Sequence, residues 1–141
     1  MTRKKILLVE DDELDVISVE RTLKKFYTSY DLLVAHNGKE ALAMLTGPDN
    51  PVSPDVILLD LNMPRMNGVE FLKAIREDAR FKHLPVFVMT TSSDNGDRTQ
   101  TEQLGVSGYI IKPLSDTNVK KVDSMDAFVQ FHLRKILASD G

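Results

Sequence analysis

Three consecutive acids, Glu10, Asp11 and Asp12, follow directly after the apolar run Ile6–Val9. Carboxylates this close repel one another: at an effective dielectric constant of about 20, two that lie about 5 Å apart oppose each other by roughly 3 kcal/mol. A further acid, Asp60, ends a second apolar run. Carboxylate oxygens suit a hard cation such as Mg²⁺, and a carboxylate can also attack phosphorus to form an aspartyl phosphate. These acids predict a metal site suited to phosphoryl transfer.

Two other apolar runs also end in polar side chains. Thr90 and Thr91 follow "PVFVM", and Lys112 follows "GYII". Because phosphoryl transfer mainly requires positioning and charge neutralisation, we expect a catalytic role for both Thr90 and Lys112. The Thr90 hydroxyl would donate a hydrogen bond to a phosphoryl oxygen, and the Lys112 ammonium would supply positive charge. Taken singly, these residues could be ordinary strand-end or surface groups, and Asp60 could be a helix N-cap.

Five short aliphatic runs without polar alternation suit strands that are buried on both faces of a parallel sheet. They cover residues 5–9, 31–35, 55–60, 85–89 and 108–112. Helical patterns lie around residues 16–27, 38–45, from about 67 onward, 94–105 and 124–137. This alternation predicts an α/β fold: a flavodoxin-like, doubly wound (βα)5 sandwich of three layers, with a parallel sheet of order 2-1-3-4-5. The carboxyl ends of the first and third strands would then meet at one edge, with Glu10, Asp11 and Asp60 beside it.

Length and composition favour one ordinary globular domain over residues 1–141, without an output domain. The chain has 42% hydrophobic and 28% charged residues, and its formal net charge of −3 gives no electrostatic footprint for nucleic acid. It contains no cysteine, which excludes disulfides and thiolate metal sites. The apolar runs are too short for a membrane span or a signal peptide, so we expect a cytoplasmic protein.

Four motifs together resemble a response-regulator receiver domain, the phosphoacceptor module of two-component signalling. They are "ILLVEDD", "DVILLDLNMPRMNGVEFL", "PVFVMTT" and "GYIIKP", in this order and spacing over nearly the whole chain. The resemblance implies that Asp60 is the phosphoacceptor and that a sensor histidine kinase donates the phosphoryl group. It also implies a Mg²⁺ (or Mn²⁺) site at Glu10, Asp11 and Asp60, with Asn62 contributing its backbone carbonyl.

The same resemblance assigns the remaining roles. Thr90 would be the switch hydroxyl, Tyr109 the switch aromatic, and Lys112 the phosphate-contacting base, with a cis bond between Lys112 and Pro113. The protein would catalyse only its own phosphorylation and dephosphorylation and would not be an enzyme in the ordinary sense. More narrowly, "VEDDELDV" and "FVMTTS" are similar to the stand-alone regulators that bacteria pair with phytochrome-type histidine kinases.

The polar fourth helix suggests where the signal leaves the molecule. Residues 94–105 contain one large apolar side chain, Leu104, so this helix is held weakly and a modest free energy can reposition it. We expect it to form the output face with the fifth strand and the last helix, and this face could mediate homodimerisation. Two departures from the family pattern are Thr91, which would narrow access to the acyl phosphate, and the long segment 113–124, which leaves the geometry of that interface open.

Two other functions share some of these features. A Mg²⁺-dependent phosphohydrolase would also use an aspartyl phosphate, but such enzymes commonly carry an Asp-x-Asp pair at the first strand, whereas "DLN" lies on the third. A flavodoxin-like cofactor binder needs a phosphate loop after the first strand, and the acidic "EDDELD" would repel a phosphate. The histidines lack the spacing of metal ligands and are expected to be at the surface or half-buried; they are His36, His83 and His132.

Overall fold

The computed structural model describes residues 4–26, 30–47, 53–61, 68–90 and 101–111. The strands are β1 (Lys4–Val9), β2 (Tyr30–Ala35), β3 (Val56–Asp60), β4 (Val86–Thr90) and β5 (Gly108–Ile111). The helices are α1 (Glu13–Phe26), α2 (Gly38–Thr46) and α3 (Gly68–Glu77). The strand predictions are confirmed to within one residue at each end. The predicted helix 124–137 and the segment 113–124 lie outside the described residues.

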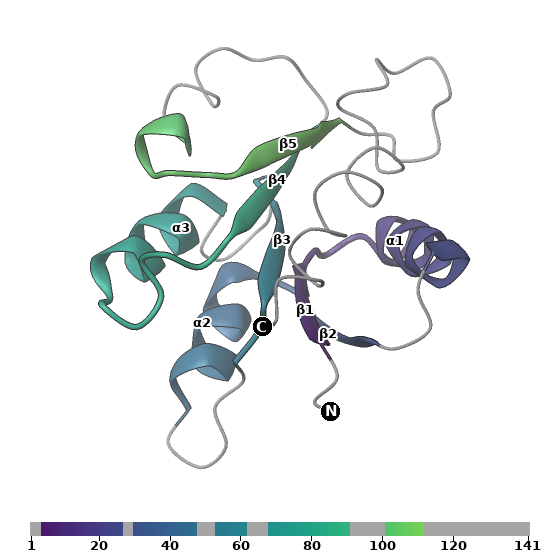
Figure 1. Cartoon of the computed structure of the whole chain (residues 1–141), viewed down its shortest axis with the longest axis horizontal. Helices are drawn as coiled ribbons and strands as arrows, with labels where there is room; N and C mark the ends of the chain where they lie inside the picture. Colours follow the sequence, from purple (N-terminus) through teal and green to yellow (C-terminus); the bar gives the residue numbers. More distant parts are fainter. Residues whose placement is uncertain (1–3, 27–29, 48–52, 62–67, 91–100, 112–141) are drawn as a thin grey trace.

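All five strands form one parallel sheet of order β2-β1-β3-β4-β5, as predicted. Figure 1 shows α1 on one face of this sheet and α2 and α3 on the other. The order places β1 beside β3 at the centre, where the chain reverses the direction in which it adds strands. In doubly wound sheets, ligand sites lie at the carboxyl ends of the strands at this point.

Alternate residues of each central strand supply two separate cores. Leu7 and Val9 pack with α2 and α3, whereas Ile6 and Leu8 pack with α1. Every residue of β3 is buried, which explains why its sequence is aliphatic without alternation. The edge strand β2 is only half-buried over most of its length. The acids that follow β1 and end β3 are therefore carried by the most deeply buried part of the sheet.

The acid run divides at the start of α1. The Leu14 amide donates a hydrogen bond to Oδ1 of Asp12 at 2.9 Å, so Asp12 caps the helix that begins at Glu13. Acids in the first turn and lysines in the last complement the helix dipole. Asp12 thus belongs to the helix start and not to the metal-binding acids.

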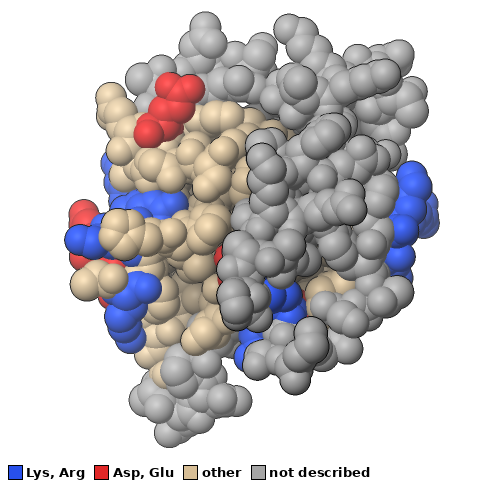
Figure 2. Space-filling model, in the orientation of Figure 1, with Lys and Arg blue, Asp and Glu red and all other residues tan. Residues whose placement is uncertain are grey.

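Residues 101–103 are helical, and the chain leaves this helix at Gly105 with φ of 71°. The positive φ explains why a glycine ends this helix, because this backbone conformation is strained for residues with a Cβ atom. Figure 2 shows the Lys and Arg side chains of the described residues in several separate groups, at both side edges and near the lower centre of that view. Among the described ranges, no helix has the length and apolar character needed to cross a membrane.

Candidate functional site

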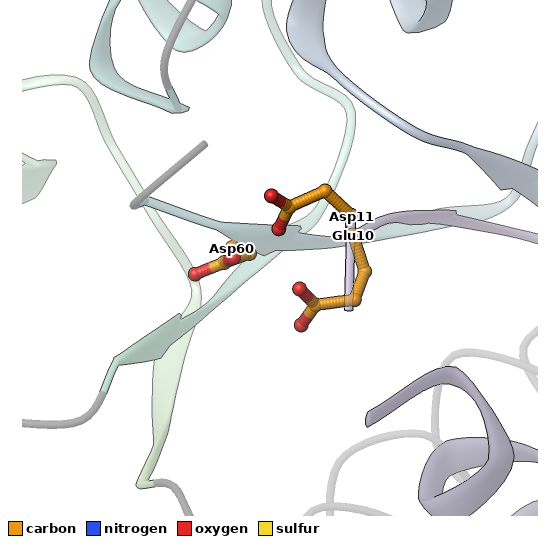
Figure 3. Close-up of side chains that lie close together, drawn as sticks. All are labelled: Glu10, Asp11 and Asp60. Atoms are coloured by element: carbon orange, nitrogen blue, oxygen red, sulfur yellow. The ribbon is translucent and has the colours of Figure 1, made fainter. Parts of the chain in front are cut away.

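The predicted acids meet at the carboxyl edge of the sheet. Val9 of β1 pairs with Leu59 of β3, so Glu10 and Asp60 leave adjacent strands at the same level. Glu10, Asp11 and Asp60 each place one carboxylate oxygen within 4.8 Å of the others. Figure 3 shows the three side chains directed toward a common space. The sheet therefore brings together residues that are far apart in the sequence, and we call these three side chains the acid cluster.

The acid cluster combines deep burial with like charge. Glu10 is 0% exposed and Asp60 is 3% exposed, whereas Asp11 is exposed. Burial disfavours ionised carboxylates, and three of them at this separation repel one another. Oxygen donors with this charge fit a hard divalent cation, which would neutralise the repulsion. The donor set therefore fits Mg²⁺ or Mn²⁺.

Backbone hydrogen bonds fix Glu10 at the end of β1. Its amide donates to the Ala35 carbonyl of β2 at 2.9 Å. Its Oε2 atom accepts a hydrogen bond from the Asp12 amide at 3.2 Å. Glu10 is thus held by both the neighbouring strand and the start of α1, which leaves its carboxylate little freedom to move away from Asp60.

Gly68 also belongs to the site, although its sequence context predicts only a place on the apolar face of α3. Its amide donates to the Leu61 carbonyl at 3.1 Å. A Cβ atom there would lie 2.6 Å from the Asp60 carbonyl oxygen and 2.7 Å from the Leu61 Cα atom. Only glycine therefore lets α3 begin directly against the end of β3. The sequence contains a hint in the pair Asn67-Gly68 soon after Asp60.

A pocket of about 300 Å³ lies beside the acid cluster. Glu10 and Asp11 line one part of it, and Val16, Ile17 and His36 line others. Ile17 is 49% exposed on the surface of α1. The pocket gives Glu10 and Asp11 an approach from solvent with an apolar border.

The remaining predicted residues are placed only in part. Thr90 ends β4, whose neighbour β3 ends at Asp60, so its backbone reaches the same edge of the sheet as the acid cluster. Nothing is described of the Thr90 side chain, and Asn62, Thr91 and Lys112 lie outside the described residues. The predicted convergence is thus confirmed for the three acids and untested for the hydroxyl and the ammonium.

Tyr109 lies on β5 and is half-buried against the core that contains α3. Its hydroxyl is 2.7 Å from Oγ1 of Thr101, and either oxygen can donate this hydrogen bond. Thr101 is 0% exposed, although its neighbours in the sequence "TQTEQ" are all polar. The sequence gives no signal for this contact, because the two residues meet only when the helix packs beside β5.

The histidines at described positions lie at the surface, as predicted. His36 and His83 are exposed, and Nδ1 of His36 lies 3.3 Å from Oε1 of Glu40 on α2. His132 lies outside the described residues. His36 also lines the pocket, but it is not among the three acids that gather at the sheet edge.

Comparison with known proteins agrees with this geometry. The response regulator receiver domain family matches residues 6–122. The response regulator Rcp1 of Synechocystis sp. is 34% identical over 129 residues, which cover 89% of this chain and 88% of that protein. The crystal structure of its Mn²⁺-bound form has a TM-score of 0.78 and 33% identity, over 91% of this chain and 93% of that one.

A second solved structure is similar to the same extent. The phosphorylated cyanobacterial phytochrome response regulator RcpA has a TM-score of 0.78 and 30% identity, over 99% of this chain and 97% of that one. The family match spans most of the chain and includes all three residues of the acid cluster. The chain therefore belongs to the response regulator receiver domain family, whose members are phosphoacceptor regulators of two-component signalling.

Proposed function

We propose that Asp60 is the phosphoacceptor and that a sensor histidine kinase phosphorylates it in a Mg²⁺-dependent reaction. The observation that supports this most directly is the acid cluster, in which Asp60 lies with Glu10 and Asp11 at the sheet edge. Asp60 ends the buried strand β3, so its backbone is fixed while its carboxylate lies at the rim. A positioned carboxylate of this kind is a competent nucleophile toward phosphorus.

The reaction transfers one phosphoryl group without a change in oxidation state. A carboxylate oxygen of Asp60 attacks the phosphorus atom of a phosphohistidine, the new P–O bond forms, and the P–N bond breaks. The imidazole leaves with the electron pair of that bond and takes up a proton. A bound divalent cation supplies charge neutralisation for the phosphoryl oxygens. Asp11, which is exposed, would be its direct ligand, and the buried Glu10 would act through water, with the Asn62 carbonyl completing the set.

The other residues of the proposal act on the phosphoryl group or respond to it. Lys112 would contact a phosphoryl oxygen, and Thr90 would hydrogen-bond to another. The strand order supports both roles, because β4 lies beside β3 and β5 lies beside β4 in the same parallel sheet. Tyr109 would then change position and alter the face formed by residues 94–105, β5 and the last helix. The protein would also hydrolyse its own aspartyl phosphate.

The similarity to Rcp1 and RcpA supports a more specific class of kinase as the phosphoryl donor. We propose that the donor is a phytochrome-type histidine kinase and that the output face mediates protein contacts, including homodimerisation. Residues 1–141 would act as one receiver unit in the cytoplasm. The single sheet that joins all described strands supports this unit.

Mass spectrometry after incubation with acetyl phosphate and Mg²⁺ tests the proposal. We expect one added phosphoryl group on Asp60, none in Asp60→Asn, and none when the metal is chelated. Asp15→Asn on α1 is the matched control and should be phosphorylated like the wild type. A phosphoryl group that persists in Asp60→Asn would overturn the assignment. Steady turnover of varied phosphomonoesters would instead indicate the phosphohydrolase.

A further inference from the structure

Residues 101–105 are held at two points by hydrogen bonds of different kinds. At the first, the Thr101 hydroxyl shares a hydrogen bond of 2.7 Å with the hydroxyl of Tyr109 on β5. At the second, the Arg76 guanidinium on α3 donates from Nε to the Leu104 carbonyl at 2.7 Å and from Nη2 to the Gly105 carbonyl at 3.2 Å. The segment is thus tied to the sheet at one end and to a neighbouring helix at the other.

The hydrogen bonds at these two points differ in strength. Hydrogen bonds in which the donor is charged are roughly twice as strong as neutral ones. Arg76 makes two of these to the segment and a third from Nη1 to the Phe81 carbonyl at 3.0 Å, which also orients its planar side chain. The bond between Thr101 and Tyr109 is a single contact between two neutral hydroxyls. A perturbation from the acid cluster would therefore break the hydrogen bond between Thr101 and Tyr109 before those that Arg76 donates.

Burial of Thr101 raises the free-energy cost of breaking its hydrogen bond to Tyr109. Thr101 is 0% exposed, whereas Tyr109 is half-buried and within reach of solvent. When Tyr109 turns away, the buried Thr101 hydroxyl loses a partner, and a buried hydroxyl that loses a hydrogen bond raises the free energy of that state. The phenol loses less, because water can replace the contact. The Thr101 hydroxyl therefore favours the arrangement in which Tyr109 stays beside residues 101–105.

We propose that Thr101 is a positioning residue that holds Tyr109 beside residues 101–105 and thereby sets how readily this protein adopts the phosphorylated arrangement. Arg76 holds the other end of this segment through its hydrogen bonds to the Leu104 and Gly105 carbonyls. The proposal rests on the proposed function, because it takes Tyr109 as the group that responds to a phosphoryl group on Asp60. It adds a buried threonine, on a helix of otherwise polar sequence, as the residue that opposes the response.

The test measures the binding of beryllium fluoride, a tetrahedral mimic of an acyl phosphate, in the presence of Mg²⁺. Thr101→Val keeps the size and β-branching of the side chain but removes the hydroxyl. We expect it to bind the mimic about fivefold more tightly than the wild type, which corresponds to the loss of one hydrogen bond of about 1 kcal/mol. Thr101→Ser keeps a hydroxyl and should bind within about twofold of the wild type on the same scale.

A double-mutant cycle separates this role from a merely structural one. In Tyr109→Phe, which has already lost the hydrogen bond, the added change Thr101→Val should leave the affinity for the mimic unchanged. An unchanged affinity in Thr101→Val alone, or an equal gain in both backgrounds, would overturn the proposal. A loss of thermal stability without a change in affinity would do the same. Should Thr101→Val fail to fold, Thr101→Ala repeats the test with a smaller side chain.

The same experiment reports separately on the proposed function. Asp60→Asn should not bind the mimic at all, whatever residue stands at position 101. Binding of the mimic to Asp60→Asn would refute Asp60 as the phosphoacceptor. Normal dependence on Asp60 with no effect of Thr101→Val would refute only the role of Thr101.

Discussion

At the carboxyl ends of β1 and β3, three carboxylates lie within 4.8 Å of one another, whereas beside α3 a single guanidinium meets three backbone carbonyls. Both arrangements gather groups from distant parts of the sequence. In the second, the negative ends of the carbonyl dipoles face the positive charge of Arg76, so the backbone itself stabilises that charge. In the first, each added acid increases the repulsion. A cluster of like charges, such as the three acids, therefore indicates a ligand site. A charge surrounded by groups of opposite polarity, such as Arg76, indicates a structural contact.

The two positions also differ in what surrounds them. Asp11 is exposed and Glu10 and Asp60 are buried, so the acid cluster reaches from the core to the surface. Partial burial lowers the pKa of the Arg76 guanidinium, but the ordinary pKa of arginine is so high that the group stays charged. The difference between a ligand site and a structural contact can be tested by neutralising one charge in each.

The largest effect is expected for Asp11→Asn, measured as Mn²⁺ and Mg²⁺ affinity by titration calorimetry. A unit charge about 4 Å from a divalent cation contributes about 8 kcal/mol at an effective dielectric constant of about 20, and exposure of Asp11 together with the lost hydration of the ion reduces this to about 2 kcal/mol. Affinity should therefore fall roughly 30-fold. Without metal the same change relieves repulsion, so the variant should unfold at a higher temperature than the wild type.

Asp12→Asn is the matched control for this prediction. It removes the same charge one residue further along, and asparagine still caps α1. Its metal affinity should stay within about twofold of the wild type, because Asp12 is not part of the acid cluster. An equal loss in both variants would mean that general acidity, and not the cluster, binds the metal.

A smaller effect is expected for Arg76→Gln, measured as the free energy of unfolding in urea. The change removes charge-assisted hydrogen bonds to three carbonyls and should cost about 2 kcal/mol. Arg76→Lys should cost nearly as much, because one ammonium cannot span the same three acceptors. Mn²⁺ affinity should be unchanged in both. The control Arg80→Gln, at an exposed site, should cost clearly less than either change at Arg76. A loss of Mn²⁺ affinity in Arg76→Gln would show that the two regions are coupled.

The sequence predicts one of these regions far better than the other. The acids could be placed because parallel strands end at one edge, so a residue that follows β1 and a residue that ends β3 must come together. Arg76 could not be placed, because its partners are backbone carbonyls. Every residue has a carbonyl, so the residue types at Leu104 and Phe81 do not indicate these contacts. Thr101 was missed for a related reason, since its burial depends on how a short polar helix packs beside β5.

The smallest effect concerns an acid whose partner lies two residues away. Hydrogen bonds from the Arg80 side chain and backbone hold the pKa of Asp78 below its ordinary value. A carboxyl whose pKa is lower in the folded state adds stability above its unfolded pKa of about 3.9, and this stability is lost as the pH falls through the folded value. Asp78→Asn should therefore be slightly less stable than the wild type at neutral pH and equal to it in strong acid. Urea unfolding of both proteins across this range measures the difference, which Mn²⁺ should not change. A difference that grows toward low pH would contradict the sign, and one that depends on Mn²⁺ would mean that this local ion pair and the acid cluster are not independent.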